Sequence, residues 1–141
     1  MIYFAYGSNM KFERISERIE DVEYVDIGCL FDYKLLCNKK SVDGTGKANI
    51  VYSPGDIVWG VLFGIDDNYA DKLDMIEKGY EREKFEIDTD NGKINANAYI
   101  SNKLTDSPPS SYYKDLIVQG AVEYYLPSDY IEYLMGLPTQ D

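Results

Sequence analysis

Tyr3-Phe4-Ala5-Tyr6-Gly7-Ser8-Asn9-Met10 is the stretch near the start of the chain that decides the expected fold. Its first four residues are aromatic or apolar, as in a buried strand, and Gly-Ser-Asn then ends the strand. A helical pattern begins directly after this turn. Such a junction points several backbone N–H groups at one place, where they could hold an anion. The alternative is an ordinary connection, in which Gly7 relaxes the turn and Ser8 or Asn9 caps the helix.

The length and composition predict one folded domain, residues 1–141. Hydrophobic residues make up 45% of the chain, enough to build a core in a domain of this size. Tyrosine accounts for 14 residues. A tyrosine buries a large ring but needs a partner for its hydroxyl, so we expect some of these side chains to line a polar cavity.

The charged and reactive residues exclude several classes of function. A net charge of −11 without a Lys/Arg cluster argues against nucleic acid or a membrane surface as a partner. The absence of histidine excludes Ser-His-Asp and Cys-His catalysis and any zinc site that needs imidazole. Cys29 and Cys37 are expected to be buried free thiols, which fits a reducing cytoplasm. The longest apolar runs are only a few residues, so no signal peptide or membrane span is expected.

The pattern along the chain predicts an α+β domain dominated by antiparallel strands. The expected strands are 1–6, 22–37 with a break near Gly28, 49–52, 57–65, 80–88 and 94–101. The expected helices are 9–20, 66–78 and 128–135, capped in the last two cases by Asp66 or Asp67 and by Ser128. Residues 112–124 are compatible with either a helix or a strand.

Two turns, a loop and a helix end interrupt this pattern. Ser53-Pro54-Gly55-Asp56 predicts a tight type II turn, and 38–46 predicts a polar loop. Asp90-Asn91-Gly92 is a strong hairpin signal. Gly79 stands where a helix ends in the left-handed conformation.

Glu77 is the carboxylate that position singles out. It falls at the end of the expected helix 66–78, where the helix dipole disfavours a negative charge. One interpretation is a solvated glutamate beside Lys78. If the side chain instead points into a tyrosine-lined cavity, burial and the dipole raise its pKa and make it a usable general base.

Several motifs are similar, in the same order, to those of the γ-glutamylcyclotransferase-like (AIG2-like) family. They are the opening stretch 3–10, Ser53-Pro54-Gly55-Asp56 followed by Val58-Trp59-Gly60-Val61-Leu62-Phe63, Leu73-Asp74-Met75-Ile76-Glu77, Ala98-Tyr99-Ile100, and Pro108-Pro109-Ser110-Ser111-Tyr112-Tyr113. The chain departs from one common pattern at Lys78, which precedes Gly79 where some members have glycine directly. The matching motifs cover most of the chain, so the resemblance is specific.

This resemblance implies a fold, a reaction and a set of site residues. The implied fold is a mainly antiparallel, partly closed barrel-like sheet flanked by a few short helices. The implied enzyme is a cyclising amide lyase or acyltransferase that converts a γ-glutamyl amide into 5-oxoproline and a free amine. Glu77 would be its catalytic general acid/base, and no metal or cofactor would be needed. The substrate-binding residues implied are Tyr6, Gly7, Ser8, Asn9, Tyr80, Tyr99 and Tyr113, with a packing role left open for Tyr113.

Alternatives remain at two levels. A non-catalytic module of the same fold would bind a small acidic ligand without turning it over, and a plain interaction protein would have no cavity beside Glu77. Within the enzyme class, the leaving group could be an α-amino acid, a dipeptide, a lysine ε-amine or another amine. The acidic composition weakly favours a cationic leaving group. A monomer and a homodimer are both compatible with the sequence.

Overall fold

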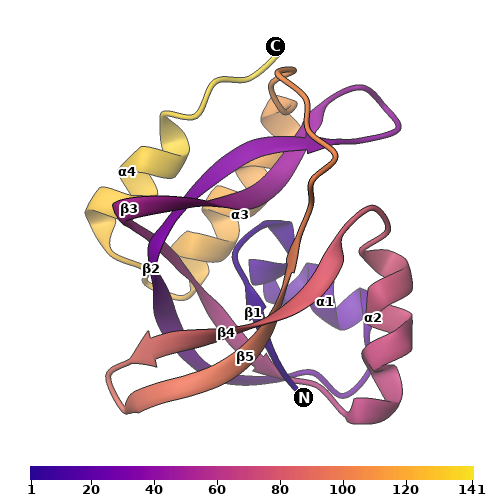
Figure 1. The fold of residues 1–141 in the computed structure, drawn as a ribbon, viewed down its shortest axis with the longest axis vertical. Helices are drawn as coiled ribbons and strands as arrows, with labels where there is room; N and C mark the ends of the chain where they lie inside the picture. Colours follow the sequence, from indigo (N-terminus) through magenta and orange to yellow (C-terminus); the bar gives the residue numbers. More distant parts are fainter.

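The computed structural model describes all 141 residues and contains five strands and four α-helices. The strands are β1 (Ile2–Ala5), β2 (Glu23–Lys40), β3 (Gly46–Gly64), β4 (Glu81–Thr89) and β5 (Gly92–Ile100). The helices are α1 (Phe12–Arg18), α2 (Ala70–Ile76), α3 (Ser111–Glu123) and α4 (Ser128–Met135), with 3₁₀ turns at Ser8–Met10 and Asp67–Tyr69. In Figure 1, α3 and α4 lie together on one side of the sheet.

The five strands form a closed barrel in the order β1-β3-β2-β4-β5. All neighbouring strands are antiparallel except β1 and β5, which close the barrel where Tyr3 lies beside Asn97. The prediction of a mainly antiparallel α+β fold is confirmed. The barrel is closed rather than partly closed, because the short β1 is wedged between β3 and β5.

β2 and β3 form one long ribbon, and here the predicted strand bounds were wrong. β2 runs through Gly28 without a break, and both strands extend into the expected loop 38–46. The stretch Ser53-Pro54-Gly55-Asp56 does not reverse the chain. It bulges out of β3 opposite a single residue of β2, Asp32, whose carboxylate accepts a hydrogen bond from the N–H of Gly55 at 3.0 Å. Gly55 has the positive φ of 89° that the sequence predicted for it, so the local turn exists inside a continuous strand.

The helical predictions were right in position and less accurate in detail. The open stretch 112–124 is the helix α3. The first helix is interrupted at Lys11, whose extended ψ of 116° separates the 3₁₀ turn from α1. Asp66 caps the next helical segment by accepting from the N–H of Asn68 at 2.8 Å. Ser128 is not a cap but the first residue of α4, which follows Pro127.

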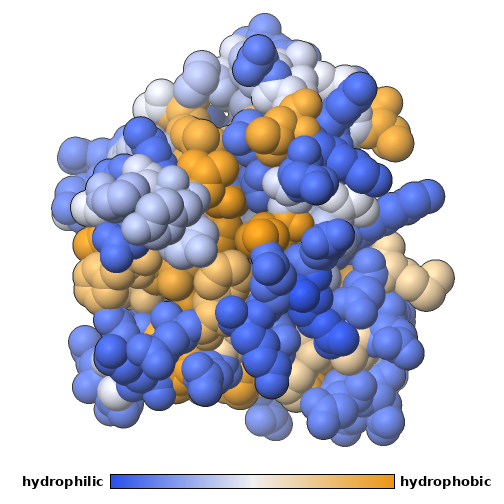
Figure 2. Space-filling view, viewed as in Figure 1, coloured by the Kyte–Doolittle hydropathy of each residue, from blue (hydrophilic) through white to orange (hydrophobic).

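The hairpin of β4 and β5 was predicted correctly, and Gly79 and Gly92 both have positive φ. The hydrophobic core is a cluster of 27 buried residues from both the strands and the helices, which includes Phe4, Leu62 and Ile117. On the face drawn in Figure 2 most of the surface is hydrophilic, and hydrophobic residues show between polar side chains. No helix is both long and apolar enough to span a membrane. Cys29 and Cys37 are free; Cys29 is buried, whereas Cys37 is half-buried.

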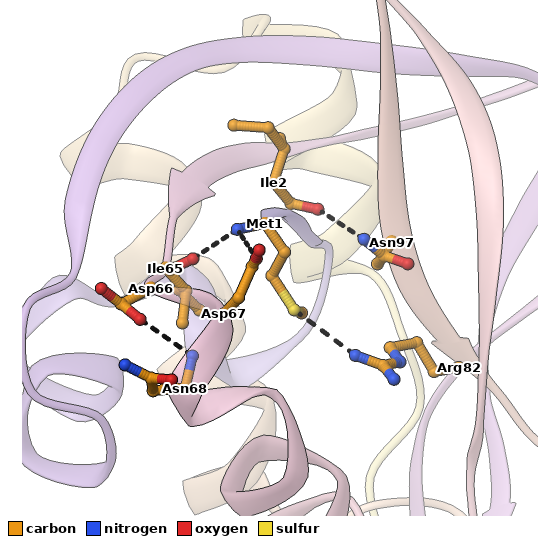
Figure 3. A network of polar contacts seen from close by, with 8 residues as sticks. All are labelled: Met1, Ile2, Ile65, Asp66, Asp67, Asn68, Arg82 and Asn97. Atoms are coloured by element: carbon orange, nitrogen blue, oxygen red, sulfur yellow. Dashed lines mark hydrogen bonds and ion pairs between the residues drawn. The ribbon is translucent and has the colours of Figure 1, made fainter.

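The beginning of β1 is anchored to the end of β3 and to the hairpin (Figure 3). The Met1 ammonium donates to the carbonyl of Ile65 at 2.5 Å and to Oδ1 of Asp67 at 2.8 Å. The amide of Asn97 donates to the carbonyl of Ile2 at 3.3 Å. These contacts fix β1 in the seam of the barrel, and β1 leads directly into the turn at Gly7.

Candidate active site

A cavity of about 200 Å³ lies beside the turn that follows β1. The eight candidate residues from the sequence all line it: Tyr6, Gly7, Ser8, Asn9, Glu77, Tyr80, Tyr99 and Tyr113. They come from the β1 turn, the end of α2, the segment between α2 and β4, β5 and the first turn of α3. The structure therefore brings together residues from both halves of the chain.

Glu77 lies at the wall of this cavity, immediately after the last residue of α2. Its N–H still bonds to the carbonyl of Leu73 at 2.9 Å, and Gly79 then turns the chain away with a φ of 90°. Its Oε1 accepts a hydrogen bond from Nδ2 of Asn9 at 2.8 Å, and the hydroxyl of Tyr3 approaches the same oxygen at 3.4 Å. The carboxylate is therefore turned inward and is not the solvated glutamate of the alternative interpretation.

Asn9 links Glu77 to Arg18 through the two ends of its side-chain amide. Nη1 of Arg18 donates to Oδ1 of Asn9 at 3.1 Å, while Nδ2 of Asn9 donates to Glu77 and to the hydroxyl of Tyr3. Because a guanidinium can only donate, it fixes which end of the amide is the oxygen. The NH₂ group must then face the carboxylate.

The pKa of Glu77 reflects two opposing influences. Burial raises the pKa of Glu77, because the charged form loses its water. The positive charges of Arg18, Arg14 and Lys39 and the hydrogen bond from Tyr3 counteract this effect by stabilising the carboxylate. The net direction is upward, which suits a group that must exchange a proton near neutral pH.

The turn at Tyr6 and Gly7 presents free backbone donors next to the cavity. Neither N–H donates a hydrogen bond within the chain. Gly7 has a φ of −110°, so it is not required for a left-handed conformation. It is required for space, because a Cβ at this position would lie 3.0 Å from Cβ of Ala48 and 3.6 Å from the hydroxyl of Tyr113. The capping alternative was wrong, since no side chain caps either helical segment here.

Most of the expected tyrosine hydroxyls are engaged with the protein itself. Tyr6 donates to the carbonyl of Tyr99, and Tyr80 donates to the carbonyl of Ala48 at 2.7 Å. Tyr99 donates to Oδ1 of Asp74 at 2.5 Å, so its ring lines the cavity while its hydroxyl points elsewhere. Tyr113 accepts from the N–H of Ala48 at 3.0 Å and keeps its own hydroxyl hydrogen available as a donor.

Sequence reasoning missed Tyr3 and the basic residues of the cavity. Arg14, Arg18, Lys39, Lys47 and Lys78 all line it, and Nε of Arg14 donates to Oγ of Ser8 at 3.0 Å. The spacing of Arg14 and Arg18 by four residues on the helix after the motif was the one available signal, since it places both on the same face. The lysines carry no such signal.

The cavity thus combines one carboxylate of raised pKa with several cations, neutral hydroxyls and free backbone N–H groups. No group of three or more Cys, Asp or Glu side chains gathers as a metal site would require. This set of groups can exchange a proton through Glu77 and can bind an anionic, hydrogen-bonding small molecule.

Comparisons with known proteins show the family of the chain. The model of the AIG2-like family matches residues 57–134. The chain is 34% identical to the γ-glutamylcyclotransferase of Homo sapiens and 35% identical to that of Mus musculus, each over 150 aligned positions that cover 99% of this chain and 80% of the relative. A solved structure described as a γ-glutamyl cyclotransferase superposes with a TM-score of 0.94 at 33% identity, covering all of this chain and 89% of the other.

A more distant solved structure, YkqA from Bacillus subtilis, shares only the fold. It is 20% identical with a TM-score of 0.79, and the match covers 99% of this chain and 55% of that one. The family match extends over more than half of the chain, and the full-length relatives are more than 30% identical. The chain therefore belongs to the AIG2-like family of γ-glutamylcyclotransferases.

Proposed function

We propose that the protein is a γ-glutamylcyclotransferase that cyclises a γ-glutamyl amide to 5-oxoproline and releases the amine. The observation that carries this proposal is the inward-facing Glu77 carboxylate, held by Asn9 and Tyr3 at the wall of a cationic cavity. The substrate supplies its own nucleophile, so the residues need only fold the substrate and move protons.

In this reaction the α-amine nitrogen of the γ-glutamyl group attacks its γ-carbonyl carbon. The new C–N bond closes a five-membered ring, and the original amide C–N bond then breaks. The α-ammonium loses two protons on the way to the ring N–H, one before the attack and one after it. Glu77 takes each of them in turn and gives it to the nitrogen of the departing amine, which leaves as an ammonium ion, so protons balance over the cycle. Folding the substrate so that the amine meets the carbonyl is an entropic task that a preorganised cavity performs.

The turn after β1 is suited to bind negative charge on the substrate. The backbone N–H groups of Tyr6 and Gly7 are free, and those of Ser8 and Asn9 belong to the same turn. We propose that these groups bind the α-carboxylate or the oxygen that becomes negative during attack on the γ-carbonyl. The free hydroxyl hydrogen of Tyr113 is a further donor, while Tyr6, Tyr80 and Tyr99 shape the cavity with their rings.

The substitution Glu77→Gln tests this function directly, because glutamine keeps the shape and the hydrogen bond from Asn9 but cannot accept a proton. We expect the wild type to release 5-oxoproline from γ-glutamyl-alanine and the variant to lose about 10²-fold or more in kcat. Glu83→Gln is the matched control, since Glu83 is an exposed glutamate on β4. Near-normal turnover by Glu77→Gln would contradict the general-base role. Ligand binding without any release by the wild type would favour a non-catalytic module.

We further propose that the protein acts in the cytoplasm. Cys29 and Cys37 are both free thiols, a state that a reducing compartment maintains.

A further inference from the structure

We propose that Ser101, held in place by the buried side chain of Asn49, is a positioning residue for Glu77. The inference rests on the proposed function, because it says what keeps the general base directed into the cavity. Neither Ser101 nor Asn49 lines the cavity, and both act through the turn that follows Glu77.

The helix α2 does not by itself fix the direction of Glu77. Glu77 follows the last residue of α2, and its ψ of 43° lies outside the helical range. Residues 77–80 then form a tight turn, in which the N–H of Tyr80 donates to the carbonyl of Glu77 at 3.1 Å and Gly79 has a φ of 90°. The side chain of Glu77 points where this turn directs it, so whatever holds the turn also holds the carboxylate.

Ser101 holds this turn from outside. Its Oγ donates to the carbonyl of Gly79 at 2.7 Å and accepts from the N–H of Lys103 at 3.1 Å. The hydroxyl of Tyr80 donates to the carbonyl of Ala48 on β3 at 2.7 Å. The end of the turn is therefore attached to β3 through Tyr80 and to the segment after β5 through Ser101.

Asn49 fixes Ser101 in turn. The side chain of Asn49 is fully buried, its Oδ1 accepts from the N–H of Ser101 at 3.0 Å, and its Nδ2 donates to the carbonyl of Ser101 at 2.9 Å. The same Nδ2 donates to Oδ1 of Asn38 at 3.0 Å. Both ends of the buried amide are thus paired, and a fully paired buried network holds its members in one arrangement.

The amide of Asn49 does at this place what a strand does elsewhere in the barrel. β3 and β5 are not neighbours in the strand order, because β1 lies between them. β1 ends at Ala5, and Ser101, the residue after β5, lies beyond that end. Asn49 bonds there to both backbone groups of Ser101, as a neighbouring strand would. An apolar side chain could fill the same space but could not hold Ser101.

The substitution Ser101→Ala tests the inference, because it removes the hydroxyl that bonds to Gly79 and leaves the two backbone bonds to Asn49. With γ-glutamyl-alanine as substrate, we expect kcat to fall by about tenfold, since a displaced base meets the substrate less often in the reactive geometry. KM should change by less than about twofold, because the β1 turn that binds the substrate is untouched. Ser101→Thr keeps a hydroxyl and should restore most of kcat.

Thr89→Val is the matched control. The hydroxyl of Thr89 donates to the carbonyl of Gly92 at 2.7 Å and accepts from the N–H of Asn91 at 3.0 Å. These are the same two kinds of bond that Ser101 makes, but they lie in the turn of the β4–β5 hairpin. Thr89→Val should leave kcat and KM unchanged.

The pH profile separates positioning from a mere loss of folded protein. The net effect of the cavity is to raise the pKa of Glu77, so a carboxylate that is free to turn toward water returns to its lower, ordinary pKa. The acidic limb of kcat/KM should therefore move to lower pH in Ser101→Ala, and in the same direction in Asn49→Ala. The titratable groups around Glu77 are Tyr3, Tyr6, Arg14, Arg18, Lys39, Tyr80, Tyr99 and Tyr113. Neither variant replaces any of them.

The position of the acidic limb does not depend on how much of a variant is folded. An unchanged kcat in Ser101→Ala, or a lower kcat with the acidic limb at the pH of the wild type, would overturn the positioning role. Release of no 5-oxoproline by the wild type would instead contradict the proposed function.

Discussion

Glu77 shows how a single carboxylate is prepared for proton exchange. Burial raises its pKa, whereas the positive charge of Arg18 and the hydrogen bond from Tyr3 lower it, so that the pKa is raised but not as far as burial alone would raise it. Tyr3 lies against the same oxygen, and burial followed by the charge of Glu77 raises the pKa of Tyr3 well above its ordinary value. Tyr3 is therefore a neutral donor at neutral pH.

Arg18 should control the pH at which the enzyme becomes active. Its positive charge is the largest influence that lowers the pKa of Glu77 against the effect of burial. Replacing it with methionine removes stabilisation of the carboxylate, so the pKa of Glu77 rises and a higher pH is needed to ionise the base. The acidic limb of the pH profile of kcat/KM should therefore move to higher pH in Arg18→Met.

Arg18→Lys separates the charge of Arg18 from its hydrogen bond. Lysine keeps the positive charge but not the fixed geometry of the bond to Asn9, so its acidic limb should lie nearer to that of the wild type while kcat falls. Acidic limbs that coincide in all three proteins would show that Arg18 does not tune Glu77.

At the scale of elements, α3 positions the 3₁₀ turn Ser8–Met10 by packing directly against its backbone. A Cβ on Gly120 would lie 2.7 Å from the backbone nitrogen of Lys11 and 2.7 Å from Cβ of Met10. Such distances leave no room for a methyl group, and backbone atoms cannot move aside cheaply. Glycine at this position therefore allows α3 to seat the 3₁₀ turn that carries Ser8 and Asn9.

Gly120→Ala should lower the free energy of unfolding by about 1–3 kcal/mol, the usual effect of overpacking. It should also raise KM, because the turn is pushed away from the cavity. Gly136→Ala is the matched control at the end of α4, where a Cβ would lie 3.5 Å from its nearest neighbour in ordinary contact. Urea unfolding and initial-rate kinetics measure both effects. Equal stability of the two variants would show that α3 can shift without loss.

The ends and turns of the elements differ in how well the sequence predicts them. Asp66, Gly79 and the Asn91-Gly92 pair mark ends and turns by their own chemistry, and the structure agrees at each of them. The prediction that 53–56 separates two strands was wrong because a turn with Pro and Gly can either reverse a chain or bulge from a strand. Only its partner Asp32, about twenty residues earlier, decides between the two.

Some features of the candidate site could be predicted from the sequence and others could not. The β1 turn and Glu77 could be located from the sequence because both have local signals, a glycine turn and a carboxylate at a helix end. The inward direction of Glu77 could not, because it depends on contacts between distant segments. The lack of room for a side chain at position 7, beside Ala48, could not be predicted from the sequence for the same reason.

At the scale of the whole molecule, the acidic surface should limit stability at low ionic strength. The net charge of −11 on 141 residues means that negatively charged side chains repel one another in the folded state, and salt screens this repulsion. We expect the Tm at pH 7.5 to rise by a few degrees when NaCl is increased from about 10 mM to about 150 mM. The rise should shrink at pH 5, closer to the pI of about 4.4. Differential scanning calorimetry measures it, and a Tm that falls with salt would contradict this view.

The site draws on β1, at one end of the chain, and on Tyr113 of α3, far along it, whose hydroxyl receives the N–H of Ala48. During synthesis on the ribosome, the wall of the cavity is thus completed only when α3 has emerged. A stalled nascent chain that ends before Ser111 can contain Glu77 and the β1 turn and still be inactive. Catalysis by this protein therefore depends on α3 having been synthesised and packed, although Glu77 and the β1 turn precede α3 in the chain.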